Sequence, residues 1–184
     1  SFFNEFFLLK EISNAFSKKL VNDHILDANK RKQISSFYLK AFEWFEKAAN
    51  NNDAMAQFIL GDIYLNGIRV ERNLKKAKEY FEKAALQGHT ISEFILGNIY
   101  YNGYETEQNF EKAVFWYEKA ALKGDPKAQF NLGLMYDEGE GVIQNYEKAF
   151  KWFEEAAKQG LPEAQYNLGC MYEDGEGVQQ NYEK

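Results

Sequence analysis

The stretch "MYDEGEGVIQNYEK" at residues 135–148 is written again, with small changes, as "MYEDGEGVQQNYEK" at residues 171–184. The two copies lie 36 residues apart, and the same offset relates landmarks along most of the chain. A Leu-Gly pair recurs with this period, and a tyrosine follows three residues after each glycine. The pairs begin at Leu60, Leu96, Leu132 and Leu168. No insertion breaks the register from Ser36 to Lys184, so this part of the sequence consists of internal repeats.

Each repeat predicts two helices. Four apolar residues of the first repeat form one stripe at helical spacing: Ala56, Leu60, Ile63 and Tyr64. We expect first helices at residues 54–66, 90–102, 126–138 and 162–174. The second helix follows an asparagine, a residue type that readily accepts a hydrogen bond from an unpaired amide at a helix start. These asparagines are Asn73, Asn109, Asn145 and Asn181. Gly88, Gly124 and Gly160 fit the position after a helix end that often requires a positive φ.

Acidic residues and glycines crowd the turn between the two helices of the last two repeats, so a metal site and a phosphate site are alternatives to a plain turn. In the earlier repeats the same segments read "NGIRVERN" and "NGYETEQN". Leu65 and Asn66 therefore stand where the third repeat has Asp137 and Glu138. A metal site could not keep its ligands if two carboxylates were replaced in this way. No segment has the ligand spacing of a calcium loop, and no Lys-Ser/Thr pair follows the glycines. We expect structural turns, with a weak divalent-ion site at the last two turns as the alternative.

The pattern "AQFNLGLMYDEGEGVIQNYEKAFKWFEEAAKQG" at residues 128–160 resembles the Sel-one-like repeat, a 36-residue relative of the tetratricopeptide repeat. The similarity covers about residues 37–184. It implies adaptor and scaffold roles in which protein complexes are assembled for signalling, membrane-protein quality control or bacterial contact with host cells. Some bacterial members carry a cysteine pair in every repeat, and a few are described as β-lactam-binding. This chain has one cysteine, Cys170, and departs from that subgroup.

We therefore expect an all-α fold, a right-handed α-solenoid of stacked antiparallel helix pairs in 36-residue repeats. The solenoid is predicted to span residues 36–184, with a half repeat at 37–52, repeats from 53, 89 and 125, and a partial repeat at 161–184. Residues 1–35 do not follow the repeat. We expect them to form a degenerate N-terminal helical cap or the end of a preceding domain. The final "NYEK" matches residues 145–148, so we expect the fold to continue beyond Lys184.

The chain offers few residues for catalysis. Its two histidines, His24 and His89, lie in different units, and no cluster of His and Cys has metal-ligand spacing. Cys170 stands where other repeats have Asp, Asn or Leu, which favours a tolerated small apolar residue over a nucleophile. We therefore expect no enzymatic activity, no cofactor and no bound metal.

Composition and charge set further limits. No apolar run approaches the ~20 residues of a membrane-spanning helix, so no transmembrane segment is expected. A single cysteine permits no intrachain disulfide, which suits a soluble protein, either cytoplasmic or exported without disulfides. Residues 125–184 hold 5 Lys against 12 Asp and Glu, a net charge of −7 in a chain of net −6, whereas residues 1–49 carry +2. This gradient argues against nucleic acid and favours a protein partner with a basic segment, unless the acidic turns only keep the protein soluble.

Positions that differ between repeats are candidates for binding a partner, because positions that stay the same serve packing. In a tetratricopeptide-like solenoid the first helices line a concave groove, which the side opposite their apolar stripe would face. The predicted partner-binding residues on that side are Asp62, Leu65, Asn66, Asn98, Tyr101, Asn102, Leu134, Asp137, Glu138, Glu173 and Asp174. The amide side chains both donate and accept, which suits an extended peptide backbone. Aromatic residues recur on the same side and are expected to pack against the neighbouring helix: Phe58, Phe94, Phe130 and Tyr166.

These observations favour a non-enzymatic adaptor or scaffold module that binds a peptide or helical segment of another protein in the concave groove. The alternative is a structural spacer or assembly segment of a longer multidomain protein, which would use its ends or convex face. A small-molecule or β-lactam-handling enzyme is the third hypothesis, and the missing cysteines and catalytic clusters disfavour it. Binding of a basic segment should weaken at high salt, whereas apolar end-to-end stacking should not. The oligomeric state is left open.

Overall fold

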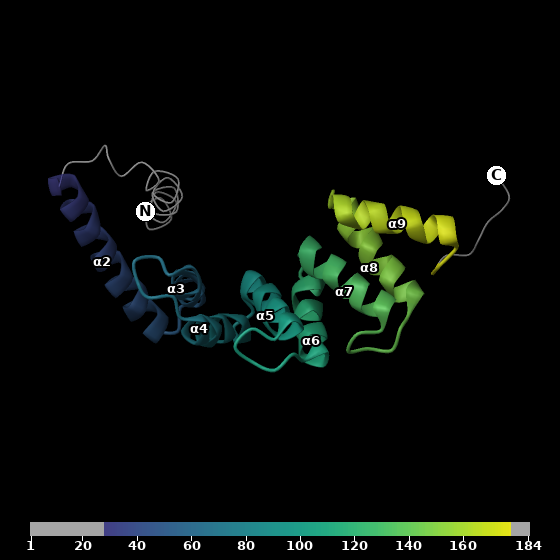
Figure 1. Ribbon diagram of the computed structural model, residues 1–184, viewed down its shortest axis with the longest axis horizontal. Helices are drawn as coiled ribbons and strands as arrows, with labels where there is room; N and C mark the ends of the chain where they lie inside the picture. The colour runs from purple at the N-terminus through teal and green to yellow at the C-terminus, as the bar shows by residue number, and fades with distance from the viewer. Residues whose placement is uncertain (1–27, 178–184) are drawn as a thin grey trace. The chain divides into compact units, whose positions relative to one another are not determined.

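The computed structural model describes residues 28–177, and this range contains eight α-helices and no strand (Figure 1). The helices are α2 (Ala28–Asn50), α3 (Ala54–Asn66), α4 (Leu74–Leu86), α5 (Thr90–Asn102), α6 (Phe110–Leu122), α7 (Pro126–Glu138), α8 (Tyr146–Lys158) and α9 (Pro162–Asp174). The bounds of α3, α5, α7 and α9 are those predicted for the first helix of each repeat, and α4, α6 and α8 are the second helices. The helix predicted after Asn181 lies outside the described residues, as does most of the predicted N-terminal cap.

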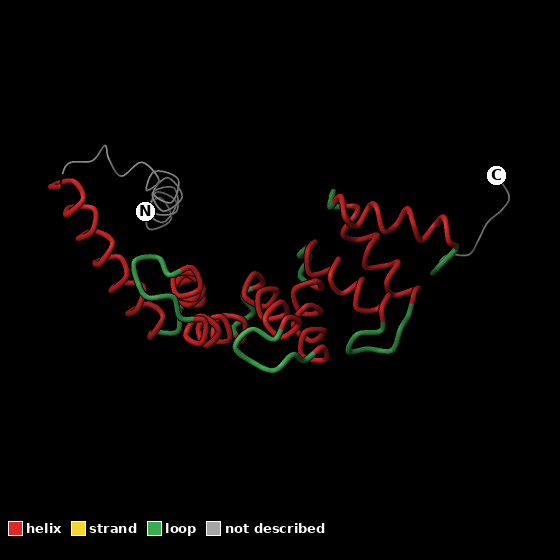
Figure 2. The backbone as a smooth tube through the Cα atoms, in the orientation of Figure 1, coloured by secondary structure: helices red, strands yellow, loops and turns green. Residues whose placement is uncertain are grey.

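The chain divides into two compact units, residues 1–43 and 44–184. The described part of the first unit is the helical segment 28–43 of α2. The second unit holds the last turns of α2 and the seven helices from α3 to α9, joined by short loops (Figure 2). The predicted boundary between residues 35 and 36 falls within α2 and stays a prediction.

Within the second unit, each helix from α3 onward packs against the next one along the chain. The helices of one repeat pair as α3 with α4, α5 with α6, and α7 with α8. Contacts of α4 with α5, α6 with α7, and α8 with α9 join consecutive repeats, and α5 also touches α7. Helical hairpins that contact only their neighbours in this way make an α-solenoid. The predicted all-α solenoid is therefore confirmed.

Side-chain caps mark the starts of the helices from α3 to α8. The asparagines predicted to cap the second helices do so: the Oδ1 atoms of Asn73, Asn109 and Asn145 accept from backbone amides at 2.9, 2.8 and 2.9 Å. Asp53 and Asp125 cap α3 and α7 in the same way. The start of α5 differs, because Nδ1 of His89 accepts from the Ser92 amide. The glycines predicted after the second helices, Gly88, Gly124 and Gly160, have φ values of 85°, 90° and 85°.

The Leu-Gly pair builds the core of each repeat. Leu60, Leu96 and Leu132 are fully buried between the helices. The glycine that follows each leucine lets an aromatic ring of the second helix lie directly against the first helix. A Cβ atom at Gly97 would stand 2.3 Å from the ring of Tyr117. Gly61 and Gly133 face the rings of Phe81 and Phe153 at 2.6 Å in the same way. This close approach explains why the glycine recurs with the leucine.

The recurring aromatic residues of the first helices also contact these rings. Phe58, Phe94 and Phe130 lie 6.1, 6.0 and 5.7 Å, between ring centroids, from Phe81, Tyr117 and Phe153. The packing role expected for these three residues is therefore confirmed. The equivalent Tyr166 of α9 differs, since 72% of it is exposed. The second helix that supplies the ring in other repeats would follow Asn181, outside the described residues.

The acidic, glycine-rich turn of the third repeat is connecting backbone held by specific contacts. Gly139 ends α7 in the left-handed conformation with φ 75°, and its amide donates to the Met135 carbonyl oxygen. Gly141 has φ 69°, and a Cβ atom there would lie 2.5 Å from the carbonyl carbon of Phe110 in the preceding repeat. Nε2 of Gln144 bonds back to the Asp137 carbonyl oxygen at 2.7 Å. Across residues 28–177, no three His, Cys, Asp or Glu side chains gather closely enough to hold a metal ion.

Candidate functional site

The predicted binding residues occupy one side of α3, α5, α7 and α9, which we call the first-helix face. Its outermost row is the last residue of each helix: Asn66, Asn102, Glu138 and Asp174. All four are exposed. The preceding row consists of Leu65, Tyr101 and Asp137, which are half-buried, and Glu173, which is exposed. These two rows therefore change from neutral and apolar in the first two repeats to acidic in the last two.

The exposed amides of this face are already engaged on their donor side. Nδ2 of Asn66 donates to the backbone and carboxylate oxygens of Asp62 at 3.0 and 2.8 Å. Nδ2 of Asn102 donates to the backbone oxygen of Asn98 at 2.8 Å. Both bonds run back one helical turn. Neither amide oxygen accepts a hydrogen bond within the described residues, and Asn102 still has a second N–H group that can donate.

Asn98 has a packing role that the sequence did not indicate. Its Oδ1 accepts from the Tyr117 hydroxyl at 2.7 Å and from Nδ2 of Asn131 at 3.4 Å. These contacts tie α5 to α6 and α7. Burial raises the pKa of Tyr117 well above its ordinary value of 10, so the phenol stays a donor to Asn98. Asn98 thus supports the first-helix face from within.

Tyr101 and Leu134 also belong partly to the core. The ring of Tyr101 meets Phe110 edge-on at 5.4 Å between centroids. Burial raises the pKa of Tyr101, and a hydrogen bond to the Glu140 carboxylate adds to the effect. Leu134 packs on the cluster of buried residues that includes Phe153.

Two carboxylates of the face are partly shielded from water. Burial raises the pKa of Asp62, and its hydrogen bond from Asn66 opposes that effect. Burial also raises the pKa of Asp137. The carboxylates beyond them, Glu138, Glu173 and Asp174, are exposed, so these three carry the accessible negative charge of the face.

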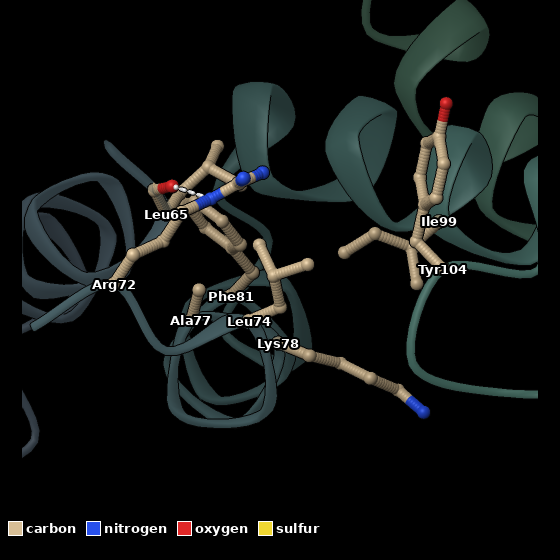
Figure 3. A pocket seen from close by; sticks show the side chains of 8 residues that line it. All are labelled: Leu65, Arg72, Leu74, Ala77, Lys78, Phe81, Ile99 and Tyr104. Atoms are coloured by element: carbon tan, nitrogen blue, oxygen red, sulfur yellow. Dashed lines mark hydrogen bonds between the residues drawn. The ribbon is translucent and has the colours of Figure 1, made fainter. Parts of the chain in front are cut away.

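A small pocket with a volume of about 260 Å³ opens between the first and second repeats (Figure 3). Its lining residues are Leu65 of α3, Arg72 of the next loop, Leu74, Ala77, Lys78 and Phe81 of α4, Ile99 of α5, and Tyr104 of the loop after α5. Figure 3 shows Leu74 and Ile99 pointing toward each other, while the ammonium of Lys78 points away from them. Nε of Arg72 donates to the Leu65 carbonyl oxygen at 3.0 Å. The pocket thus has apolar walls and two cations at its edge, and Leu65 links it to the first-helix face.

One set of polar pairs escaped the sequence analysis. Each pair joins the first turn of a first helix to the residue after the following second helix. Gln87 donates to Gln57 at 2.7 Å, and Gln159 donates to Gln129 at 2.8 Å. In the repeat between them, Lys123 donates to both carboxylate oxygens of the buried Glu93, at 2.6 and 2.8 Å. The recurrence of long polar side chains at these positions, 30 residues apart, was the signal that could have revealed the pairs.

Comparison with known proteins gives one family. The Sel1 repeat matches residues 38–53, 54–89, 90–125, 126–161 and 162–184. No curated protein matches the sequence. None of the helices among the described residues is both long and apolar enough to cross a membrane.

Three solved structures are similar. A protective antigen present in uropathogenic Escherichia coli strains, which displays an SLR fold, is 42% identical with a TM-score of 0.72, over 77% of this chain and 30% of that chain. A Sel1 repeat protein from Oxalobacter formigenes is 34% identical with a TM-score of 0.68, and the match covers 71% of this chain and 98% of that chain. Cysteine rich protein B of Helicobacter pylori is 28% identical with a TM-score of 0.54, and the match covers 70% of this chain and 92% of that chain. The present chain spans less than a third of the E. coli antigen.

These matches agree with the fold and with the resemblance read from the sequence. Sel1 repeat proteins generally mediate protein–protein interaction, and scaffolds built from these repeats are typically non-enzymatic. The matched repeats cover residues 38–184 without a gap. The chain belongs to the Sel1 repeat family.

Proposed function

We propose that this chain is a non-catalytic interaction module whose first-helix face holds an extended segment of another protein. The observation that carries the proposal is the exposed row at the ends of the first helices: Asn66, Asn102, Glu138 and Asp174. The core leucines, and the glycines against which the aromatic rings pack, repeat along the array. The side chains of this exposed row, in contrast, change from amides to carboxylates. Side chains that are exposed and differ between repeats are free to serve a partner.

The neutral half of the row suits a peptide backbone. The amide nitrogens of Asn66 and Asn102 bond to backbone oxygens of their own helices, which leaves the amide oxygens to accept from a partner. No hydrogen bond to either oxygen occurs within the part of the chain that the structure describes. An extended segment carries unpaired backbone N–H groups. The amide oxygens can accept hydrogen bonds from these groups whatever the sequence of the segment.

The acidic half suits a basic stretch of the same segment. Glu138, Glu173 and Asp174 are exposed, and no ion pair involves them within residues 28–177. Exposed charges attract an oppositely charged partner at a distance and raise the rate of association, and salt screens that attraction. Binding should therefore weaken as the ionic strength rises.

A quantitative pull-down with matched charge variants tests the proposal. The face variant is Glu138→Lys/Asp174→Lys, and the control is Glu79→Lys/Glu118→Lys, which makes the same change in charge at exposed positions of second helices. We expect a specific partner to be retained by wild type and control, and to be lost from the face variant and at high salt. Equal capture by all three proteins would refute the proposal and favour a spacer that uses its ends or its opposite face.

A further inference from the structure

The residues that line the pocket between the first and second repeats have equivalents one repeat later, and the two leucines among them are replaced by aromatic residues. Leu65 and Leu74 line the first pocket. The equivalent residues of the next repeat are Tyr101 and Phe110, whose rings meet edge-on at 5.4 Å. The two rings are bulkier than the two leucines and contact each other. The side chains that line the pocket are therefore particular to the first repeat.

The edge of the pocket is basic in a chain that is acidic as a whole. Residues 69–78 contain five basic residues and one acidic residue, whereas the equivalent residues 105–114 contain one basic and three acidic residues. Arg72 and Lys78 are replaced at the next repeat by Gln108 and Val114. The leucine pair and the two cations therefore occur together at this repeat, and neither is kept at the next.

The two cations differ in how they are held. The bond from Nε of Arg72 to the Leu65 carbonyl oxygen, at 3.0 Å, fixes the guanidinium beside the pocket. No carboxylate pairs with Arg72 anywhere in residues 28–177, so its terminal nitrogens remain available for a ligand. Nζ of Lys78 lies 3.8 Å from a Glu82 carboxylate oxygen and 5.0 Å from the ring centroid of Tyr100. Arg72 is therefore the better placed of the two to receive an anion.

We propose that this pocket takes one apolar side chain of the bound segment, and that Arg72, assisted by Lys78, binds a carboxylate beside that side chain. The inference rests on the proposed function, because it names what the first-helix face recognises at its N-terminal end. A volume of about 260 Å³ lies below the ~300–1,000 Å³ of typical small-molecule sites and suits a single side chain. Burial of that side chain supplies affinity, and the planar guanidinium matches a carboxylate in two parallel hydrogen bonds. The occupant is an acidic–apolar peptide motif.

The next repeat supplies the substitutions that test this inference. Leu65→Tyr/Leu74→Phe copies Tyr101 and Phe110 and should fill the pocket with a pair of rings that the fold already accommodates. Arg72→Gln/Lys78→Val copies Gln108 and Val114 and removes the charge. The glutamine retains the bond to the carbonyl oxygen seven residues earlier, because Gln108 makes that bond to Tyr101 at 2.8 Å. The filled variant and the neutral variant thus separate the apolar contribution from the charged one.

The probe is a display library of random dodecapeptides selected on the wild-type chain, followed by titration of the enriched peptides as synthetic compounds. We expect the peptides to share an apolar residue next to Asp or Glu. The filled variant should bind them at least about tenfold more weakly, because a buried aliphatic side chain is lost. The neutral variant should bind them about two- to fivefold more weakly and should no longer prefer the acidic residue.

Three results would overturn the inference. One is the absence of a shared acidic–apolar motif, and another is equal binding to wild type and the filled variant. The third is peptide binding that Glu138→Lys/Asp174→Lys abolishes while the filled variant retains it; the pocket would then be irrelevant and the proposed function would stand. If the peptides bound the wild type, the filled variant, the neutral variant and Glu138→Lys/Asp174→Lys equally well, both this inference and the proposed function would be refuted.

Discussion

Replacing Lys123 with methionine should strand the buried carboxylate of Glu93. The Glu93 side chain is 1% exposed, and both its oxygens accept from Nζ of Lys123, at 2.6 and 2.8 Å. The same ammonium also donates to the Gly88 carbonyl oxygen at 2.9 Å. Methionine keeps the apolar stem of the lysine and removes all three hydrogen bonds. The substitution therefore isolates the effect of leaving a charge without a partner.

The expected cost follows from the burial of the two partners. Removing one member of a fully buried ion pair costs about 3–5 kcal/mol, because the remaining charge stays desolvated without compensation. The Lys123 side chain is 39% exposed, so water can reach the place that the ammonium leaves. We therefore expect Lys123→Met to lower the free energy of unfolding by about 2–4 kcal/mol.

The neighbouring repeats provide the control. Gln57 with Gln87, and Gln129 with Gln159, occupy the equivalent positions and hydrogen bond at 2.7 and 2.8 Å. The double variant Glu93→Gln/Lys123→Gln should form the same neutral pair. Its stability should lie within about 1 kcal/mol of wild type, because an ion pair replaced as a whole leaves no stranded charge.

Urea unfolding followed by circular dichroism measures both variants. Hydrogen exchange at the α5 amides adds a local readout, which matters because repeat arrays can unfold in parts. Lys123→Met should speed exchange in α5, and the double variant should not. The reasoning is refuted if Lys123→Met is as stable as wild type, or if the double variant loses as much stability as the single one.

Four further substitutions can be tested on the same chain. Leu96→Ala should lower the free energy of unfolding by about 2–5 kcal/mol because the side chain is fully buried; a loss well under about 1 kcal/mol in urea would contradict this. Gly97→Ala should cost about 1–3 kcal/mol because the new Cβ would meet a core ring at 2.3 Å. A Cβ atom at Gly169 meets nothing within 4 Å among residues 28–177, so Gly169→Ala should stabilise the chain by up to about 1 kcal/mol; equal melting temperatures for the two glycine variants would count against the packing account. Burial lowers the pKa of His89 from its ordinary 6.5, so the unfolded chain binds a proton more readily than the folded one. Stability should therefore fall as the pH drops through 6.5 toward the lowered pKa, and His89→Asn, which still caps α5, should remove that part of the slope; a pH profile identical to wild type would exclude the effect.

The sequence predicted the features that are local and repeated. Helix starts depend on a side chain that bonds three residues ahead, as Asn109 does with the Lys112 amide, so the residue type in register is sufficient. The bounds of α5 and α7 follow from the apolar stripe and the closing glycines in the same way. The packing of Phe94 on Tyr117 was also within reach, because a residue that recurs in every repeat serves the core.

The sequence could not predict which side chains become partners across 30 residues or more. Glu93 and Lys123 look like two ordinary surface charges until the start of α5 and the end of α6 lie side by side. Asn98 looks like a free amide of the binding face, although it accepts from the Tyr117 hydroxyl. Residue type defines what a group can bond, whereas the stacking of helices decides what it meets.

The turn between the two helices is held in the same way in successive repeats, so the repeats differ mainly in the side chains that they expose. In each of three repeats a side-chain nitrogen donates a hydrogen bond to the carbonyl oxygen seven residues earlier and fixes the turn. The donors are Arg72, Gln108 and Gln144. The turns therefore present their exposed side chains in the same way at each step, and only the chemistry changes along the array. That chemistry has a direction, from a cationic edge with an open apolar pocket at the first repeat to exposed carboxylates at the ends of α7 and α9. A segment that satisfied both proposals would place its acidic–apolar motif against the first two repeats and its basic residues against the last two. The same segment with these two parts exchanged would bring like charges together at both ends. The order of the repeats would thus select one orientation of the partner, although the fold of each repeat is the same.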